Sequence, residues 1–221
     1  MRSALPRFPT LAEMPRRAVI ALSALALALV LVLILLLSGS SGDSSAPPAL
    51  SSVAASGFDG AAIPAGAPAQ NFTLTDQNGR SVSLRDYRGQ VVVLTFLSST
   101  CGARCVVIAQ QIRGALDELP RPVPVLILST NPAADTPASV RRFLAQMSLS
   151  GRVRYLSGPR ARLQPIWKAY GVTPAGTAQA ASERSAQVLL LDAQNRERVV
   201  FESEQLTPES LAHDIRRLQN G

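Results

Sequence analysis

The sequence predicts an α/β domain built on a mixed β-sheet, and two observations carry that prediction. Continuous apolar runs at residues 90–97 and 123–128 are typical of strands that are buried on both faces of a sheet. Segments with helical periodicity follow both runs, and a strand pair and a helix close the chain. Strands that alternate with helices in this way form a sheet covered by helices.

The first expected element is an N-terminal membrane anchor. Residues 18–37 are 20 nearly unbroken apolar positions, and at about 1.5 Å per residue they span roughly 30 Å, one hydrocarbon core. Arg16 and Arg17 precede this stretch directly, and the next basic residue is Arg80. The positive-inside rule then places residues 1–17 in the cytoplasm and the main domain outside the cell membrane, as in a single-pass protein.

A cleaved signal peptide is the alternative to this anchor. The apolar region of a signal peptide usually has about 7–15 residues, fewer than the 20 found here. A small-residue site downstream, Ser52-Val53-Ala54, keeps cleavage open. No cysteine follows the apolar run directly, which excludes a lipoprotein anchor.

Residues 38–70 are predicted to be a flexible linker. They are rich in Ser, Gly, Ala and Pro, carry almost no charge, and follow neither the strand nor the helix period. About 30 such residues reach an r.m.s. distance of roughly 30 Å. The domain expected at residues 71–221 can therefore work close to the membrane surface.

The folded domain is predicted to begin with a β-hairpin, because apolar alternation at 72–75 and 82–84 flanks a turn at 76–79. The elements expected next are a strand at 90–97, a helix at 103–119, a strand at 123–128, a helix at 137–147, a strand at 153–156, a helix from 159 or 161 to 170, strands at 187–191 and 198–202, and a last helix. Thr136 and Thr207 are expected N-caps, and Asp135 is expected to assist the first of these. This order matches a thioredoxin-like fold with an added N-terminal hairpin.

Composition excludes several classes of protein. Two cysteines exclude a disulfide-dense scaffold and a four-cysteine zinc site, and one histidine excludes any site that needs two. The net charge is +7, but its basic residues are scattered, whereas nucleic-acid binding needs them clustered among aromatic residues. We therefore expect no nucleic-acid partner. The sequence contains no Gly-x-x-x-x-Gly-Lys phosphate loop, and we expect no organic cofactor.

Cys101 and Cys105 are the candidate functional pair. At positions i and i+4 they share one face of the expected helix, with Cα atoms about 6 Å apart, within reach of a disulfide. Backbone amides at a helix N-terminus favour thiolates, and Arg104 adds a positive charge. Such a pair suits reversible thiol–disulfide exchange or the binding of a soft metal such as Cu(I). A structural disulfide is the remaining interpretation, although so short a loop would stabilise the fold weakly.

Four stretches carry a family resemblance: FTLTDQNGRSVSL, VVVLTFLSSTCGARC, STNPAADTP and YLSGPRARLQPIWKAYGV. Together they resemble the Sco/SenC family, the copper-delivery proteins of cytochrome c oxidase assembly, over nearly all of residues 70–221. The resemblance implies a thioredoxin-like fold, membrane anchoring, and Cu(I) held by two cysteines and one histidine. On that basis Cys101 and Cys105 are the metal ligands.

The family's histidine is not found at the matching position. In the family it precedes a Ser and an aliphatic strand, whereas here the segment 182–186 precedes the strand at 188–191 and places Arg184 where the histidine belongs. Arginine stays protonated and cannot ligate a metal. Arg184 is therefore a candidate for tuning the thiolates by its charge, the alternative being a solvated loop arginine. His213 is expected on the solvent face of the last helix and is not an obvious substitute.

The sequence leaves functions of different classes open. The first is a membrane-anchored extracytoplasmic protein that binds Cu(I) with its dithiol and delivers it to the copper-binding subunit of cytochrome c oxidase. The second is an enzyme, a thiol–disulfide oxidoreductase in which Cys101 and Cys105 are the catalytic pair and act on another extracytoplasmic cysteine protein. The third is an interaction module without metal chemistry, which the two retained cysteines argue against. The resemblance favours copper, and the missing histidine favours exchange.

Overall fold

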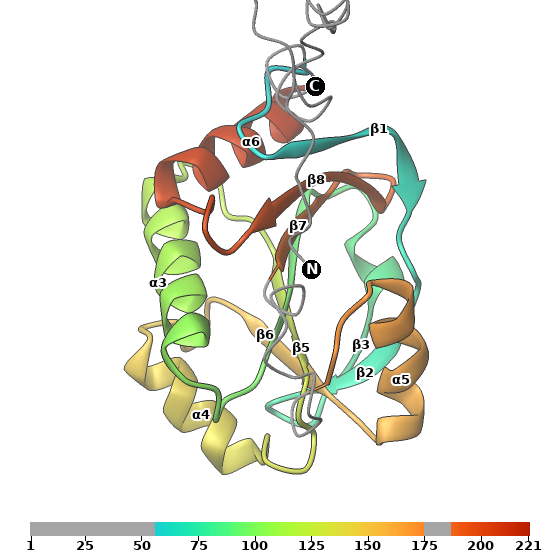
Figure 1. The fold of residues 1–221 in the computed structure, drawn as a ribbon, viewed down its shortest axis with the longest axis vertical. Helices are drawn as coiled ribbons and strands as arrows, with labels where there is room; N and C mark the ends of the chain where they lie inside the picture. The colour runs from blue at the N-terminus through green and yellow to red at the C-terminus, as the bar shows by residue number, and fades with distance from the viewer. Residues whose placement is uncertain (1–55, 175–186) are drawn as a thin grey trace, which may run out of the picture. The chain divides into compact units, whose positions relative to one another are not determined.

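The computed structural model describes residues 56–174 and 187–221, which form an eight-stranded mixed sheet with helices on both faces (Figure 1). The strand order is β1-β8-β7-β4-β5-β6-β2-β3. The strands are β1 (Ala61–Pro68), β2 (Thr73–Asp76), β3 (Ser81–Ser83), β4 (Val92–Leu97), β5 (Val125–Ser129), β6 (Arg154–Ser157), β7 (Gln187–Leu191) and β8 (Arg196–Glu202). The helices are the 3-10 helix η2 (Leu84–Tyr87) and the α-helices α3 (Ala103–Glu118), α4 (Pro137–Gln146), α5 (Arg160–Ala169) and α6 (Pro208–Asn220).

The predicted hairpin is confirmed, and it extends one edge of the sheet. β2 and β3 pair antiparallel, and β2 also pairs antiparallel with β6. β4, β5 and β6 are parallel neighbours, while β7 runs antiparallel to β4. The carboxyl ends of the three parallel strands therefore lie at the same edge of the sheet, where the helices that follow them begin.

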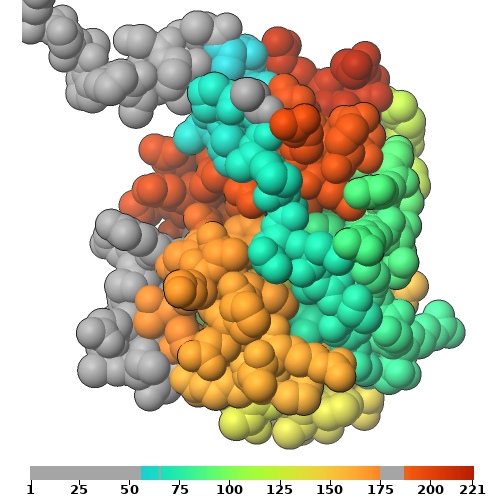
Figure 2. All heavy atoms as spheres, turned by 90° about the vertical axis from the view of Figure 1, so that its right-hand side faces the viewer, coloured from blue at the N-terminus to red at the C-terminus, as the bar shows by residue number. Residues whose placement is uncertain are grey.

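The sequence of strand β4 is continuously apolar because both faces of the sheet are covered there. Val92, Leu94 and Phe96 face one core, which includes the buried side of α5. Val93 and Leu97 face the other core, which includes α3, α4 and α6. Figure 1 shows these three helices on one side of the sheet and α5 on the other. Figure 2 shows the opposite side, where α5 in orange lies beside the teal β2–β3 region.

The predicted helix starts at Thr136 and Thr207 are confirmed. The hydroxyl of Thr136 accepts the N–H of Ser139 at 3.2 Å, and that of Thr207 accepts the N–H of Ser210 at 3.2 Å. A proline occupies the beginning of α4 and of α6, where its missing N–H leaves no unpaired donor.

The linker predicted at residues 38–70 and the domain start predicted at residue 71 are wrong, because the folded domain already includes strand β1. Residues 61–68 pair antiparallel with β8 at the edge of the sheet, with a register shift between Ala62 and Ala67. This segment contains proline and glycine and lacks apolar alternation, so its sequence does not indicate a strand. It joins the sheet through backbone hydrogen bonds, and an edge position tolerates proline.

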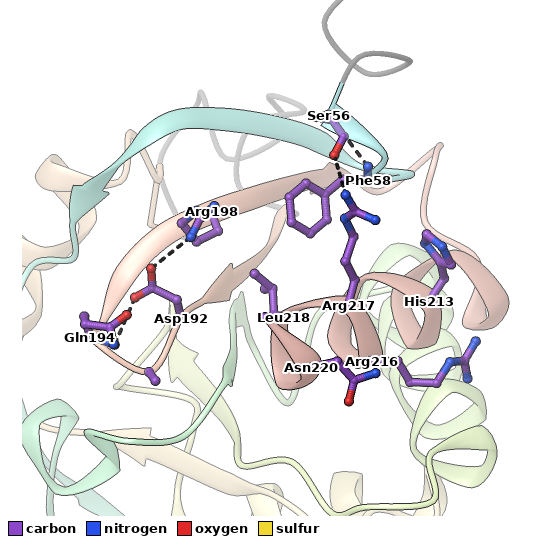
Figure 3. A pocket seen from close by; sticks show the side chains of 12 residues that line it. Ser56, Phe58, Asp192, Gln194, Arg198, His213, Arg216, Arg217, Leu218 and Asn220 are labelled. Atoms are coloured by element: carbon purple, nitrogen blue, oxygen red, sulfur yellow. Dashed lines mark hydrogen bonds and ion pairs between the residues drawn. The ribbon is translucent and has the colours of Figure 1, made fainter.

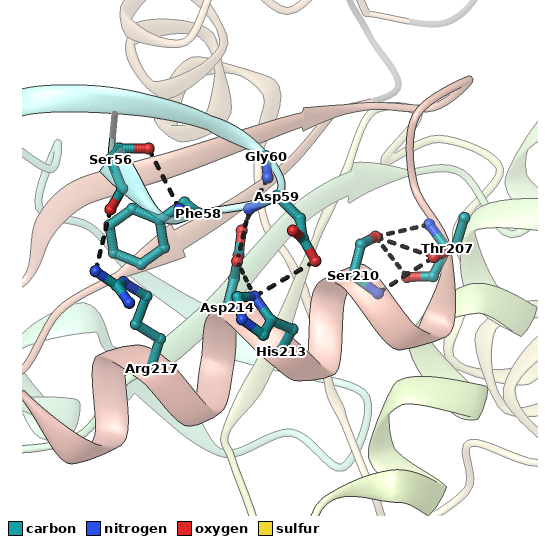
Figure 4. A network of polar contacts seen from close by, with 9 residues as sticks. All are labelled: Ser56, Phe58, Asp59, Gly60, Thr207, Ser210, His213, Asp214 and Arg217. Atoms are coloured by element: carbon teal, nitrogen blue, oxygen red, sulfur yellow. Dashed lines mark hydrogen bonds and ion pairs between the residues drawn. The ribbon is translucent and has the colours of Figure 1, made fainter. Parts of the chain in front are cut away.

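The carboxylate of Asp214 holds the chain at the beginning of β1 against α6 (Figure 4). Its two oxygens accept the N–H groups of Asp59 and Gly60, each at 2.9 Å, and the side chain is fully buried. Nδ1 of His213 lies 2.9 Å from Oδ1 of Asp214 and 3.4 Å from Oδ2 of Asp59. The edge strand is thus fixed by specific side-chain contacts, which a flexible linker would not have.

Several predictions concern residues outside the described ranges. These are the cytoplasmic segment 1–17, the anchor 18–37, the linker residues 38–55 and Arg184. Within the described ranges, no helix has both the length and the apolar character required to cross a membrane.

Candidate functional site

The two cysteines lie where the central strand passes into the first long helix. Gly102 is the N-cap of α3, so Cys101 stands just before the helix and Cys105 lies in its first turn. The N–H of Cys101 donates to the carbonyl oxygen of Ser98 at 3.2 Å, which closes the turn between β4 and α3. The fold therefore places both cysteines at the carboxyl edge of the parallel strands, where ligand sites of α/β sheets are found.

Cys101 and Cys105 form a disulfide, with their Cα atoms 5.9 Å apart. Cys105 is 6% exposed and belongs to the core beneath α3, whereas Cys101 is only partly buried. The residues between them are exposed, and Val107, one turn into the helix, is 44% exposed. A partner can therefore approach Cys101 more readily than Cys105.

The first turn of α3 favours negative charge beside the cysteines. The first turn of the helix contains no acidic side chain, its N-cap makes no side-chain hydrogen bond, and Arg104 is exposed there. The first turns of α4 and α5 also lack acidic side chains, and α5 begins with Arg160. Helix amides and guanidinium groups both favour negative charge on sulfur, so the site suits thiolate chemistry once the disulfide is reduced.

A buried carboxylate, that of Asp135, binds the turn before the cysteines. The expectation that Asp135 assists the helix cap is wrong, because the donors to its carboxylate come from Ser98, Ser99, Ser129 and Tyr155 and none of them belongs to α4. Asp135 is 4% exposed. Its Oδ1 accepts hydrogen bonds from the N–H of Ser99 at 2.7 Å, from the Ser99 hydroxyl at 2.7 Å and from the Ser98 hydroxyl at 3.1 Å.

The second oxygen of Asp135 binds the next two strands of the sheet. Oδ2 accepts hydrogen bonds from the hydroxyls of Ser129 at 2.5 Å and Tyr155 at 2.8 Å. Burial, together with the charge of Asp135 and its hydrogen bond, raises the pKa of Tyr155 well above its usual value of 10.0. The phenol of Tyr155 therefore stays protonated and is the donor in its hydrogen bond to Asp135. One carboxylate thus connects β4, β5 and β6.

The sequence contained a partial signal for this network. Ser98 and Ser99 directly follow the apolar run of β4, and Ser129 ends that of β5. Polar residues at the carboxyl ends of neighbouring parallel strands meet at one edge, which predicts a cluster there. Tyr155 gave no such signal, since an aromatic residue within an apolar strand is expected to be a core residue.

The single histidine of the chain lies away from the cysteines. Pro208, at the start of α6, lies against Gly114 of α3, about 14 Å along the helix axis past Cys105. His213 is farther along α6 and lines a pocket of about 920 Å³ that neither cysteine borders. Figure 3 shows this pocket between α6, the start of the described chain and the β7–β8 turn.

Asp59, His213 and Asp214 are the one group of three side chains among residues 56–174 and 187–221 whose ligand atoms lie close enough to share a metal ion. The cysteines are not part of this group. In the described part of the chain, the two cysteines therefore have no histidine, aspartate or glutamate close enough to act as a third metal ligand.

Comparisons with known proteins agree on one family. The SCO1/SenC family pattern matches residues 61–220. The copper-bound structure of ScoI from Bradyrhizobium japonicum is 26% identical, with a TM-score of 0.54 over 69% of this chain and 99% of that chain. A structure of BsSco, described as a member of the Sco family of cytochrome c oxidase assembly proteins, is 17% identical, with a TM-score of 0.61 over 72% of this chain and 96% of that chain. The latter likeness shows the fold alone.

A curated relative outside this family matches only part of the chain. Peroxiredoxin Bcp from Escherichia coli strain K12 is 38% identical over 82 residues, which are 37% of this chain and 50% of that protein. The chain thus spans about half the length of the curated relatives that it matches. The structural neighbours confirm the thioredoxin-like α/β fold, and the family pattern, which covers nearly the whole described domain, shows that the chain belongs to the SCO1/SenC family.

Proposed function

We propose that this protein binds Cu(I) through Cys101 and Cys105 and delivers it to the copper-binding subunit of cytochrome c oxidase. The observation that carries the proposal is the cysteine pair at the N-terminus of α3 in a SCO1/SenC protein, with Cα atoms 5.9 Å apart. The copper-bound ScoI of Bradyrhizobium japonicum, the relative with 26% identity, supports copper as the cargo. Soft thiolates are the side chains that Cu(I) prefers.

The oxidised site must be reduced before it can take copper. A dithiol reductant supplies two electrons and two protons, which break the S–S bond and yield two thiols, and the reductant leaves as its own disulfide. Cu(I) then replaces the thiol protons, and two thiolates with one Cu(I) carry a charge of −1. The helix amides, Arg104 and, in this proposal, the Arg184 guanidinium offset that charge.

The second candidate is thiol–disulfide exchange, and the unequal burial of the two sulfur-bearing residues favours it. A partner thiolate attacks the accessible Cys101 sulfur, Cys105 leaves as a thiolate, and a mixed disulfide forms. A second partner thiol then resolves it, so the partner is oxidised by two electrons and this protein is reduced by two. The BsSco structure, whose subject is a disulfide switch, is a family precedent for the redox-active pair.

An anaerobic Cu(I) titration of the reduced full chain in detergent, against a competing chelator, tests the copper proposal. We expect one tightly held equivalent, which Cys101→Ser and Cys105→Ser each abolish because a single thiolate cannot form the two-coordinate site. His213→Ala is the matched control and should leave the affinity unchanged, since the only histidine lies away from the cysteines. Arg184→His should strengthen binding by adding an imidazole ligand.

The failure of this titration would favour the second candidate. If the reduced chain does not compete with the chelator, the copper proposal is wrong, and the reduction potential becomes the next measurement. A value below about −300 mV is typical of a structural disulfide, whereas a higher value is typical of a labile, exchanging one. Thiol exchange would then be supported only by the higher value.

We also propose that residues 18–37 anchor the chain in the cell membrane with the domain on the extracytoplasmic side. The apolar length and the preceding Arg16 and Arg17 support this topology. The domain would then work on membrane-bound partners within the reach of its linker.

A further inference from the structure

We propose that Asp135 is a positioning residue for the dithiol. It holds the turn before Cys101 so that the two sulfurs of the reduced protein stay close enough to form the disulfide again. The inference rests on the proposed dithiol chemistry and applies to both the copper and the exchange candidates. It names a residue with a redox role that lies outside the Cys-x-x-x-Cys segment.

Asp135 accepts hydrogen bonds from donors on three segments of the chain. Five hydrogen bonds reach its two oxygens, four from hydroxyls and one from a backbone N–H. All five contacts come from donors, so both carboxylate oxygens act as acceptors here. Hydrogen bonds to a charged acceptor are stronger than neutral ones, which makes the contact a firm anchor.

A short path of hydrogen bonds connects Asp135 to Cys101. Ser98 donates its hydroxyl to Asp135 at 3.1 Å and accepts the N–H of Cys101 at 3.2 Å through its own carbonyl oxygen. Ser99 reaches Asp135 through both its N–H and its hydroxyl. The turn is therefore tied to β5 and β6, and its position does not depend on the disulfide alone.

The described residues contain three other buried aspartates, Asp76, Asp192 and Asp214. Asp76 and Asp192 accept backbone N–H groups within their own turns, and Asp214 accepts those at the start of β1. None of these contacts involves the turn before Cys101. Among the four, Asp135 is the one whose contacts lead to the cysteines.

A fixed turn has a direct chemical consequence. Disulfide formation within one chain depends on the effective concentration of one thiol near the other, which orientation can raise by orders of magnitude. If Asp135 no longer holds Ser98 and Ser99, Cys101 samples more positions and the disulfide becomes less favoured. Removing the Asp135 carboxylate also takes away a negative charge that disfavours thiolates. The reduced form is then stabilised, which again makes the disulfide less favoured.

The test is the reduction potential of the full chain in detergent, measured by equilibration with dithiothreitol of known oxidised fraction. We expect Asp135→Asn to lower the equilibrium constant for disulfide formation at least about tenfold, which raises the two-electron potential by about 30 mV. Asp192→Asn is the matched control, since it also removes a buried carboxylate but lies beside the amino end of β4, at the opposite end of that strand from the turn. It should leave the potential unchanged.

A second variant separates position from charge and guards against a fold that fails. Ser99→Ala removes one hydroxyl donor, keeps the N–H of residue 99 and leaves the Asp135 charge in place, so it should raise the potential by a smaller amount. If Asp135→Asn and Ser99→Ala both keep the wild-type potential, the proposal is overturned and Asp135 is merely structural. A shifted potential in a chain that binds no Cu(I) would support Asp135 while contradicting the copper proposal.

Discussion

At the scale of single residues, buried carboxylates act through the donors that surround them. Asp76 shows this at the β2–β3 turn, where its Oδ1 accepts the N–H groups of Asn78 at 2.8 Å and Arg80 at 2.9 Å. Arg154 donates to its Oδ2 at 2.8 Å. Burial raises the pKa of Asp76, but the backbone donors and Arg154 outweigh it, and the pKa is lowered from its usual value of 3.8.

This lowered pKa predicts acid sensitivity that resides in one residue. A carboxylate whose pKa is lower in the folded than in the unfolded state stabilises the fold above the unfolded value, and this stability is lost as the pH falls through the folded value. Asp76→Asn should therefore reduce the free energy of unfolding by about 1–2 kcal/mol at pH 7. The difference from wild type should shrink as the pH falls below about 4. Urea unfolding at a series of pH values measures it.

The control for this prediction is an aspartate with exposed ion pairs. Asp117 contacts Arg113 and Arg152 at 2.8 and 2.7 Å, but its side chain is 47% exposed. Asp117→Asn should change the free energy of unfolding by less than about 1 kcal/mol. A difference between wild type and Asp76→Asn that stays constant down to low pH would contradict the assigned role of Asp76.

At the scale of elements, β1 shows how a strand forms without an apolar pattern. Gly60 precedes the strand and is buried, and a Cβ at this position would lie 2.5 Å from Cγ1 of Val199 and 2.9 Å from Cζ of Phe201. The backbone just before β1 thus approaches the core side chains of β8 more closely than any residue but glycine allows. This close approach, together with the Asp214 contacts, determines where the folded chain begins.

The close approach predicts a steric penalty for Gly60→Ala. Overpacking of this kind destabilises by about 1–3 kcal/mol, and denaturant unfolding measures it. A double-mutant cycle with Val199→Ala checks the cause, because that change removes the methyl group that the new Cβ would meet. Gly60→Ala should be less destabilising in the Val199→Ala background. Equal destabilisation in both backgrounds would contradict the contact as the cause.

At the scale of the whole domain, the disulfide and the start of the described chain lie at different ends. Ser56 and Phe58 contact Arg217, near the C-terminal end of α6, through a hydrogen bond of 3.1 Å and a cation–π contact of 5.2 Å. The disulfide lies at the opposite end of α3 from the part that contacts α6. Within the described residues, the N-terminal segment therefore lies away from the disulfide.

The proposed anchor predicts how the full chain fractionates. With residues 18–37 in the bilayer, the full chain should stay in the membrane pellet after an alkaline carbonate wash, and a chain that lacks residues 1–37 should be released. The N-terminal sequence of the mature protein distinguishes the alternative. A mature chain that begins shortly after Ser52-Val53-Ala54 would show a cleaved signal peptide and contradict the anchor.

The sequence by itself determined seven of the eight strands, the α-helices and the cysteine pair, because their signals are local. Buried strands such as β4 require continuous apolar residues, Thr136 and Thr207 cap helices through contacts three residues away, and a separation of four residues keeps Cys101, just before α3, close to Cys105 in its first turn. These features depend on neighbours in the chain, and a single sequence contains that information.

Only the tertiary structure decided the edge strand β1 and the network around Asp135. β1 pairs through its backbone with β8, more than a hundred residues later in the chain, and backbone pairing leaves no mark on side-chain pattern. Asp135 was expected to assist the cap of the next helix, yet its donors come from Ser98, Ser99, Ser129 and Tyr155. Such partners meet only when parallel strands align, since the sheet register, and not sequence distance, decides which polar groups share one buried carboxylate.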